Sequence, residues 1–390
     1  MHHNLTEEQK EIRNLARTIA EEKVRPVRQK YDEEHIFPWD IVHELAKVDL
    51  FRVFIPTAYD GLVEEGVGVT NMCIVTEELS RICAGIALAF AGTGLGAFPI
   101  LLFGSEEQKK RFLPAIASGK RLAAFGLTEP VAGSDAGAIK MTARREGDHY
   151  ILDGTKIFIT NGGEAEIYTV VALTDPERGP RGASAFIVES GTPGFSYGKK
   201  ESKMGIHASM TRELVFDGAR VPAENLLGKE GAGFIVAMKT FDISRPGVAA
   251  QALGIAEGAL EEALRYVHER RQFGQSILSF QGIQWMLADM ATQVEASRAL
   301  IYQVAEMIDR GETKNVGHLS AMAKVFASDV AMKVTTDAVQ VFGGYGYMTE
   351  YPVEKMMRDA KITQIYEGTN QIQRNIIATH LIKQAARLGR

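Results

Sequence analysis

The chain has 390 residues, 45% of them hydrophobic, which is enough to fill two or three packed units. Lys and Arg total 44 against 49 Asp and Glu, and the absence of a long run of one sign argues against a nucleic-acid partner. Cys73 and Cys83 have neither metal-ligand nor disulfide spacing, which favours buried thiols in a reducing compartment. No apolar run reaches the roughly 20 residues that span a bilayer. These features predict a globular, multidomain, cytoplasmic protein.

Residues 1–122 are predicted to form an α-helical domain. A capping box at Thr6 to Gln9 begins one helix, and Ser105 to Gln108 begins another. Prolines and an Asp-Gly turn divide the region between them into short helices.

Residues 123–230 are predicted to form a β domain, a barrel or sandwich. Strand-like runs occupy 167–173, 183–188 and 213–216, and turn-forming residues separate them.

Residues 231–390 are predicted to form a C-terminal four-helix bundle. One apolar stripe indicates a long helix; it consists of Leu287, Met290, Val294, Ile301, Ala305 and Ile308. The α, β, α succession gives an α+β fold and argues against a doubly wound Rossmann domain. The glycine-rich segments 92–96 and 343–346 lack G-x-G-x-x-G spacing, so we reject a dinucleotide fingerprint.

The turn Tyr366-Glu367-Gly368-Thr369 is the most informative feature of the chain. Gly368 permits backbone geometries that a Cβ resists, so Glu367 can point into a cleft and serve as a catalytic base. Taken alone, the same tetrapeptide is better explained by an exposed glutamate at the end of a helix.

Three other segments have both a structural and a functional interpretation. The loop 127–137 is rich in small and hydroxyl residues, so it is either a surface connection or a cradle for a flat polar ring or phosphate. Strand 156–160 places Phe158 and Thr160 on one face, where they either pack in the core or meet a heteroaromatic ring. Arg270 either complements a helix C-terminus or binds a pyrophosphate. No metal-ligand cluster is apparent.

Together these segments resemble the acyl-CoA dehydrogenase family over nearly the whole chain and in the same order. The matching stretches are LTEPVAGSDAG (127–137), KIFITNGG (156–163), SRPGVAAQALGIAEGAL (244–260), ERRQFG (269–274) and QVFGGYGYMTEYPVEKMMRDAKITQIYEGTNQIQR (340–374). The resemblance implies an FAD enzyme that desaturates the Cα–Cβ bond of an acyl-CoA thioester. It also implies electron transfer to electron-transfer flavoprotein and a homotetramer built as two dimers.

By this resemblance, Glu367 is the base that removes the α-proton while the β-hydrogen leaves as hydride to flavin N5. The thioester carbonyl is expected to accept hydrogen bonds from the Glu367 backbone N–H and an FAD ribityl hydroxyl. A carboxylate in an apolar tunnel is expected to have a raised pKa, which suits a base.

The resemblance also assigns the remaining site residues. The flavin ring and pyrophosphate are expected to contact Phe125, Leu127, Thr128, Ser134, Phe158 and Thr160, with further FAD contacts from Thr369 and Gln371. The adenosine diphosphate half is expected to contact Arg270, Phe273 and Gln281, together with Gln340 and Gly344 from the neighbouring subunit. The expected substrate contacts are Thr93, Ser134, Asp242, Arg245, Tyr366 and Gly368.

Some relatives carry the base on the helix that holds Ser244, but here position 244 is serine and Glu367 is present. The expected acyl-pocket helix, 87–99, has no Arg or Lys, which disfavours a dicarboxylic acyl group. The segment 192–216 resembles bacterial short-chain, butyryl-CoA-type members most. We therefore predict a short-chain acyl-CoA substrate. The alternatives are a branched-chain or cyclic acyl-CoA dehydrogenase, an enoyl-CoA reductase or acyl-CoA oxidase on the same fold, and a flavin-free scaffold.

Overall fold

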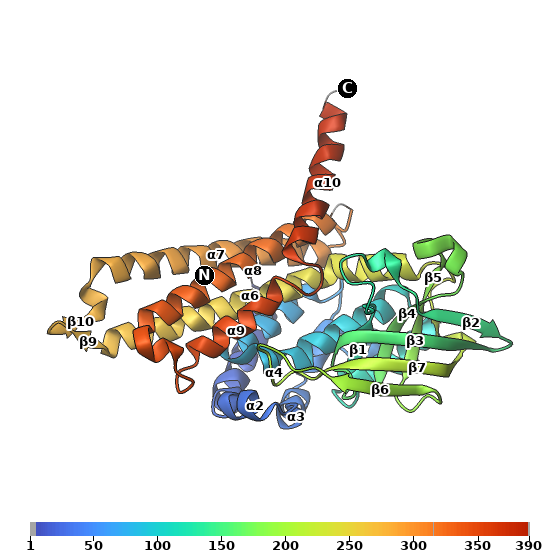
Figure 1. Cartoon of the computed structure of the whole chain (residues 1–390), viewed down its shortest axis with the longest axis horizontal. Helices are drawn as coiled ribbons and strands as arrows, with labels where there is room; N and C mark the ends of the chain where they lie inside the picture. The colour runs from blue at the N-terminus through green and yellow to red at the C-terminus, as the bar shows by residue number, and fades with distance from the viewer. Residues whose placement is uncertain (1–4, 315, 389–390) are drawn as a thin grey trace.

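The computed structural model describes residues 5–314 and 316–388. The N-terminal part is helical (Figure 1). Its elements are α1 (Glu7–Ile19), the π-helical turn η1 (Ala20–Val24), α2 (Arg28–Glu34), α3 (Trp39–Lys47), the 3-10 turns η2 (Leu50–Phe54) and η3 (Thr57–Tyr59), α4 (Val69–Phe103) and α5 (Glu106–Ala117). Both predicted capping boxes are present, with the Thr6 and Ser105 hydroxyls accepting from the backbone N–H three residues on. They start α1 and α5, as predicted.

Helix α4 forms the centre of the protein. Its backbone is extended at Cys83, with φ −157° and ψ 104°, so two helical segments meet there. By length and composition α4 is apolar enough to cross a bilayer, contrary to the sequence expectation, but most of its apolar stretch is buried inside the protein. Its glycines allow close approach to other elements, because a Cβ on Gly96 would lie 2.4 Å from the Ala124 nitrogen. Cys73 and Cys83 are both buried free thiols in this helix, as predicted.

The middle part is one eight-stranded sheet with the order β6-β7-β3-β2-β4-β5-β8, and β1 pairs with β4. The strands are β1 (Ala123–Gly126), β2 (Thr142–Glu146), β3 (His149–Thr160), β4 (Ile167–Leu173), β5 (Ala183–Glu189), β6 (Phe195–Lys200), β7 (Thr211–Pro222) and β8 (Leu226–Leu227). Short 3-10 turns, η4 (Ala136–Ala138), η5 (Pro176–Gly182) and η6 (Ala223–Asn225), connect them. Only the pair Thr142↔Leu173 joins β2 to β4, so the sheet divides into two sections at that point.

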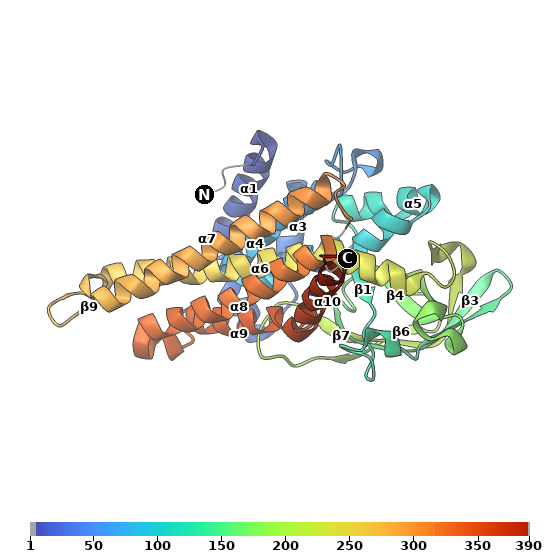
Figure 2. The same cartoon turned by 90° about the horizontal axis from the view of Figure 1, so that it is seen from above.

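The C-terminal part is again helical. Helices α6 (Gly233–Glu269), α7 (Gln281–Asp309) and α8 (Val316–Phe342) run side by side, and α9 (Val353–Thr363) packs on α8 (Figure 2). A two-stranded hairpin, β9 (Arg271–Gln272) and β10 (Gln275–Ser276), and the turn η7 (Ile277–Ser279) join α6 to α7, and η8 (Gly343–Tyr347) follows α8. The predicted apolar stripe of α7 is buried throughout. The order of helices, sheet and helices agrees with the predicted α+β fold.

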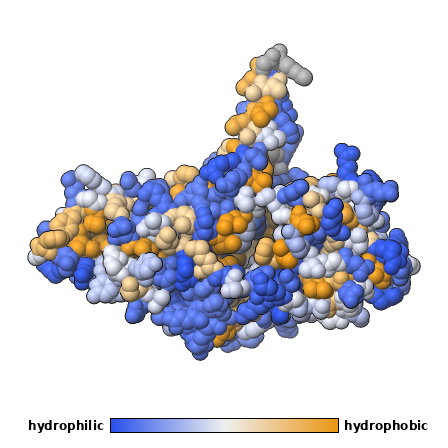
Figure 3. All heavy atoms as spheres, in the orientation of Figure 1, coloured by the Kyte–Doolittle hydropathy of each residue, from blue (hydrophilic) through white to orange (hydrophobic). Residues whose placement is uncertain are grey.

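The last helix, α10 (Asn370–Leu388), projects from the body of the chain (Figure 1). Figure 3 shows apolar residues exposed along it, and Leu381 and Ile382 are 51% and 70% exposed. Since α10 begins directly after the turn that carries Glu367, this projecting helix is covalently continuous with the candidate site.

Candidate active site

The predicted base lies in the turn between α9 and α10. Glu367 has φ 50° and Gly368 has φ 94°, so both adopt the left-handed conformation. A glutamate in this region costs about 1–3 kcal/mol, and the surroundings must therefore hold the turn. The side-chain Nε2 of Gln373 does so by donating to the carbonyl oxygens of Glu367 and Gly368, each at 2.9 Å. The carboxylate consequently leaves the helix direction, as the sequence indicated.

The Glu367 carboxylate faces α6. Ser244 Oγ donates a hydrogen bond to Glu367 Oε2 at 2.6 Å. Burial raises the pKa of Glu367, whereas this hydrogen bond and the charges of Arg245 and Lys324 oppose that rise. Some relatives are expected to carry the base on the helix that holds position 244, and here the expected base is at position 367. In this fold the two positions are in contact.

The backbone around Glu367 also offers a donor. Within the described residues, the Glu367 N–H donates to no acceptor, so it is available to a carbonyl oxygen of a bound molecule. On one side, the Tyr366 hydroxyl donates to Gln251 Oε1, which anchors the turn to α6. On the other side, Thr369 Oγ1 accepts from the Ile372 nitrogen at 3.3 Å and caps α10, while Gln371 is exposed. The predicted contacts of Tyr366, Gly368, Thr369 and Gln371 thus share one turn.

Arg245 is the second charged group beside the base. It is only 5% exposed, and its guanidinium carbon lies 5.8 Å from the centre of the Phe241 ring. Burial lowers the pKa of Arg245, and its Nε has no hydrogen-bond partner among the described residues. Asp242 Oδ1 lies 3.8 Å from Arg245 Nη1, too long for a hydrogen bond. A buried guanidinium with a free donor is suited to binding an anionic or carbonyl group of a ligand.

Lys324 on α8 was not anticipated from the sequence. It is fully buried, and its Nζ donates to the Gly368 carbonyl oxygen and to Asn370 Oδ1, each at 2.9 Å. The sequence does contain a signal for it, because Lys324 is the only charged residue in the stretch 320–328 of a helix whose neighbouring side chains are mostly apolar. A charged residue at a core position of an amphipathic helix is rare unless it is paired or functional.

The predicted ring-binding loop begins at the end of β1, near the base. Phe125 makes an edge contact with Phe241 on α6, with ring centres 5.6 Å apart. The buried Lys156 Nζ donates to the Leu127 carbonyl oxygen at 3.0 Å and to Glu129 Oε1 at 2.7 Å. Burial lowers the pKa of Lys156 to about 8, and the charge of Glu129 opposes this. The buried ion pair fixes the start of the loop.

Apart from the buried Glu129 and Ala132, the rest of this loop is half-buried or open to solvent. The Thr128 carbonyl oxygen accepts from the Ile157 nitrogen at 2.9 Å, which ties the loop to β3. Ser134 is exposed. The hydroxyls of Thr128 and Ser134 bond to no other described residue, so both are free for a ligand.

Phe158 and Thr160 lie at the end of β3, beside a register shift in its pairing with β7. Phe158 has a left-handed backbone, with φ 59°, and its side chain is 60% exposed. Bulky residues rarely adopt a positive φ, and large aromatic side chains are usually buried. Thr160 packs over Gly92, where a Cβ would lie 2.9 Å from the Thr160 methyl group. An exposed aromatic ring held by a strained backbone, with threonine hydroxyls nearby, fits a flat heteroaromatic ring such as a flavin.

The residues predicted for the adenosine diphosphate half lie at the other end of the bundle. The Arg270 guanidinium carbon is 5.4 Å from the centre of the Tyr345 ring, in the turn that contains Gly344. Phe273 has φ 54° and is 92% exposed at the tip of the β9–β10 hairpin, and Gln281 and Gln340 are also exposed. The hairpin lies at the end of the molecule opposite the sheet (Figure 1).

This separation means that one chain does not bring the two predicted halves of the cofactor site together. The sequence expectation took Gln340 and Gly344 from a different subunit than Arg270. Within one chain, the turn that holds Gly344 lies beside Arg270. The physical reason is that α6 and α8 run alongside each other, so their far ends coincide.

Thr93, an expected substrate contact, lies inside the protein. Its side chain is fully buried in α4, and its hydroxyl donates to the Ala89 carbonyl oxygen at 2.8 Å. The Asn161 amide donates to the same hydroxyl at 3.3 Å. Thr93 therefore joins α4 to the turn after β3 as part of the core.

Comparisons with protein families match three domain models to the chain. The N-terminal domain of acyl-CoA dehydrogenase matches residues 6–120, the middle domain matches 124–219 and the C-terminal domain matches 231–382. Among curated proteins, a short-chain specific acyl-CoA dehydrogenase of Clostridium acetobutylicum is 48% identical over 98% of this chain and 100% of its own length. An NADH-dependent acryloyl-CoA reductase of Anaerotignum propionicum is also 48% identical, over 98% of this chain and 97% of its own.

Solved structures give the same match. Butyryl-CoA dehydrogenase of Megasphaera elsdenii has a TM-score of 0.95 and 49% identity, covering 98% of this chain and 100% of its own. A chain in a structure described as the electron transferring flavoprotein of Acidaminococcus fermentans has a TM-score of 0.94 and 50% identity, covering 98% and 99%. An acyl-CoA dehydrogenase of Bacillus anthracis complexed with FAD has a TM-score of 0.91 and 35% identity, covering 99% and 69%.

Proposed function

Because this chain belongs to the acyl-CoA dehydrogenase family, we propose that it converts a short-chain acyl-CoA thioester to the trans-2-enoyl-CoA, with Glu367 as the base. The chain is an FAD-dependent oxidoreductase of this family. The observation that carries the residue assignment is the buried Glu367 carboxylate, held off the helix direction by a strained turn and hydrogen-bonded to Ser244.

Each residue of the site has a role in proton removal. Glu367 accepts the α-proton, and its burial makes the carboxylate a stronger base than a solvated one. Ser244 orients the carboxylate, and the free Glu367 N–H stabilises negative charge as it develops on the thioester oxygen. When bound, FAD supplies the acceptor for the β-hydrogen as hydride.

The residues near β1 and β3 fit the flavin end of the cofactor. Phe158 supplies an apolar face, Thr128 and Thr160 supply hydroxyls, and Phe125 connects this region to α6 beside the base. The cluster around Arg270 and Phe273 fits the adenosine diphosphate end of a cofactor bound to a second copy of the chain. This arrangement supports the proposal that the protein is a homotetramer built from dimers that share their FAD sites.

The substrate proposal rests on similarity and on the pocket helix. Relatives at 48–49% identity include a short-chain specific acyl-CoA dehydrogenase and a butyryl-CoA dehydrogenase. The part of α4 assigned to the acyl pocket has no basic residue to pair with a second carboxylate. The likeness to a chain in an electron transferring flavoprotein structure supports that flavoprotein as the electron partner. Two unpaired buried thiols support a cytoplasmic location.

A second candidate is reduction of a short-chain enoyl-CoA, the reverse direction on the same site. It is favoured by one observation, the 48% identity to an acryloyl-CoA reductase. Comparing turnover of butyryl-CoA with an electron acceptor against turnover of crotonyl-CoA with reduced electron-transfer flavoprotein separates the two directions. An acyl-CoA oxidase would instead be recognised by rapid reaction with oxygen.

The proposal is tested by adding butyryl-CoA to the FAD-loaded protein without oxygen. The flavin absorbance near about 450 nm is expected to bleach in the wild type and to persist in Glu367→Gln. Glu312→Gln, at an exposed glutamate paired with Arg310, is the matched control and is expected to bleach normally. Bleaching in Glu367→Gln would refute the base assignment. A wild-type flavin that stays oxidised with butyryl-CoA and with longer or branched acyl-CoAs would refute the proposed reaction.

A further inference from the structure

Lys324 is a buried cation without a nearby counter-ion. Its side chain is fully buried, and no carboxylate of the described residues lies within the 4.0 Å that defines an ion pair. An ammonium in the interior is costly unless hydrogen bonds or charges compensate for its lost hydration. Lys324 therefore occupies a position where an apolar residue would ordinarily be more stable.

Among the described residues, the Lys324 ammonium donates only to the turn of the base and to the first residue of α10. Its Nζ donates to the carbonyl oxygen of Gly368 and to the side chain of Asn370, each at 2.9 Å. The Asn370 amide in turn donates to Ser328 Oγ at 2.9 Å and to Asp329 Oδ1 at 2.8 Å. The turn that carries Glu367 is therefore held by two helices, by Lys324 of α8 and by Gln373 of α10.

The charge of Lys324 also reaches the base. Two buried cations, Arg245 on α6 and Lys324 on α8, both lower the pKa of the Glu367 carboxyl. The charged groups that act on Lys324 are Glu367, Arg245 and Asp329. Burial lowers the pKa of Lys324 to about 7, so its charge changes in the physiological pH range, while its hydrogen-bond donors remain in both forms.

We propose that Lys324 is a positioning residue for the reaction, which fixes the Glu367–Gly368 turn and with it the direction of the base. The inference rests on the proposed function of Glu367. Its hydrogen bonds among the described residues go to Gly368 and Asn370, so its expected effect on the reaction is exerted through the turn that carries Glu367.

The test compares Lys324→Met and Lys324→Gln in the full-length, FAD-loaded protein. Methionine removes both charge and donor, and kcat is expected to fall about tenfold to a hundredfold while KM stays within about threefold. Glutamine keeps a donor without charge, so it is expected to recover part of the plateau kcat. In both variants the acid limb of the pH profile of kcat/KM is expected to move to higher pH.

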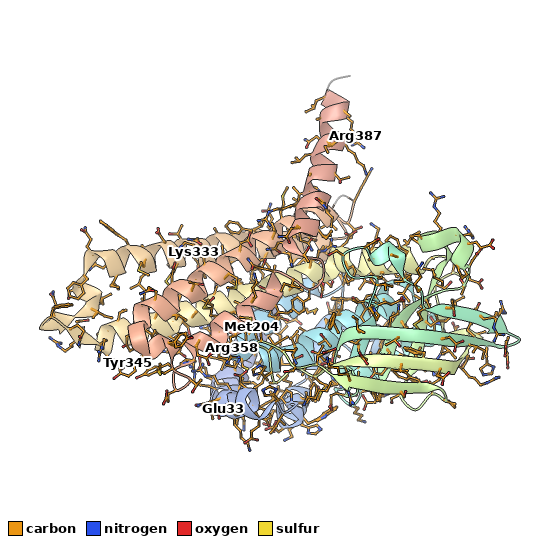
Figure 4. The ribbon with its side chains drawn as sticks, in the orientation of Figure 1. Glu33, Met204, Lys333, Tyr345, Arg358 and Arg387 are labelled. Atoms are coloured by element: carbon orange, nitrogen blue, oxygen red, sulfur yellow. The ribbon has the colours of Figure 1, made fainter. Side chains whose placement is uncertain are left out.

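Lys333→Met is the matched control, because Lys333 is on the same helix but its side chain is 54% exposed and pairs with Asp337 (Figure 4). It is expected to behave as wild type. FAD content and thermal unfolding of each variant are measured alongside kinetics, because a purely structural lysine would change these and leave the pH profile in place.

Two outcomes would overturn the inference. One is a Lys324→Met enzyme with wild-type kcat and an unmoved acid limb. The other is a raised KM with unchanged kcat, which would place Lys324 in substrate binding. If Lys324→Met does not retain FAD, the pH profile of Lys324→Gln decides. If the proposed function itself were wrong, the wild type would turn over no acyl-CoA. That result is distinct from a failure of the Lys324 inference, in which the wild type remains active.

Discussion

Replacing Ser244 by alanine removes the shortest hydrogen bond to the proposed base, the 2.6 Å contact to Glu367 Oε2. This bond favours the carboxylate over the carboxylic acid and so lowers the pKa of Glu367; its loss raises that pKa. A hydrogen bond to a charged group contributes about 1.5–3 kcal/mol, and 1.4 kcal/mol corresponds to a factor of about ten. On the acid limb, where little base is ionised, we expect kcat/KM to fall about tenfold in Ser244→Ala.

On the plateau the base is ionised in both enzymes, so kcat/KM is expected to change less than about threefold. The assay is kcat/KM for butyryl-CoA across the pH range, with an artificial electron acceptor. Ser297→Ala is the control, because Ser297 is also a buried helical serine but donates to the Gln293 carbonyl oxygen within α7. An acid limb of Ser244→Ala at or below the wild-type position would refute the reasoning, because it would show that the hydroxyl does not stabilise the ionised base.

Three further predictions concern packing, the cofactor loop and a helix cap. A Cβ on Gly258 would lie 2.0 Å from a carbonyl oxygen of α4, so Gly258→Ala is expected to lower the free energy of unfolding by about 3 kcal/mol or more. Gly282→Ala, with nothing within 4 Å, should change it little, and equal stability of the two variants would contradict this account. Lys156→Met removes the bond to the Leu127 carbonyl oxygen and is expected to weaken FAD binding to the apoprotein about tenfold, measured by flavin titration; unchanged affinity would exclude this role. Thr6→Ala removes a capping box and is expected to cost about 1 kcal/mol in equilibrium unfolding, and no loss would show that α1 does not need its cap.

Features with local causes were predictable from the sequence. The starts of α1 and α5 follow from Thr6 and Ser105, whose hydroxyls bond within their own first turns. The strand predicted at 167–173 has the same bounds as β4 because its residues form a continuous apolar run. The turn after Glu367 was anticipated because Gly368 permits backbone geometries that a Cβ resists, whereas the left-handed conformation of Glu367 itself was not predicted.

Features that depend on which elements meet were harder to predict. The hydrogen bond between Asn161 and the Thr93 hydroxyl depends on how α4 lies against the turn after β3. The role of Lys324 depends on α8 passing beside a turn 44 residues later in the chain. The pairing of Arg270 with the Gly344 turn depends on the lengths of α6 and α8, because the two helices run alongside each other and end at the same place.

The position of α10 makes the carboxyl-terminal segment sensitive to shortening. Asn370 and Gln373, which hold the Glu367 turn, belong to the first turn of this helix, whereas the exposed Leu381 and Ile382 lie near its far end. A stop codon placed after Arg374 would leave both anchoring side chains in place. A stop codon only a few codons earlier would release a strained glutamate from its supports while leaving the sheet and the long helices intact.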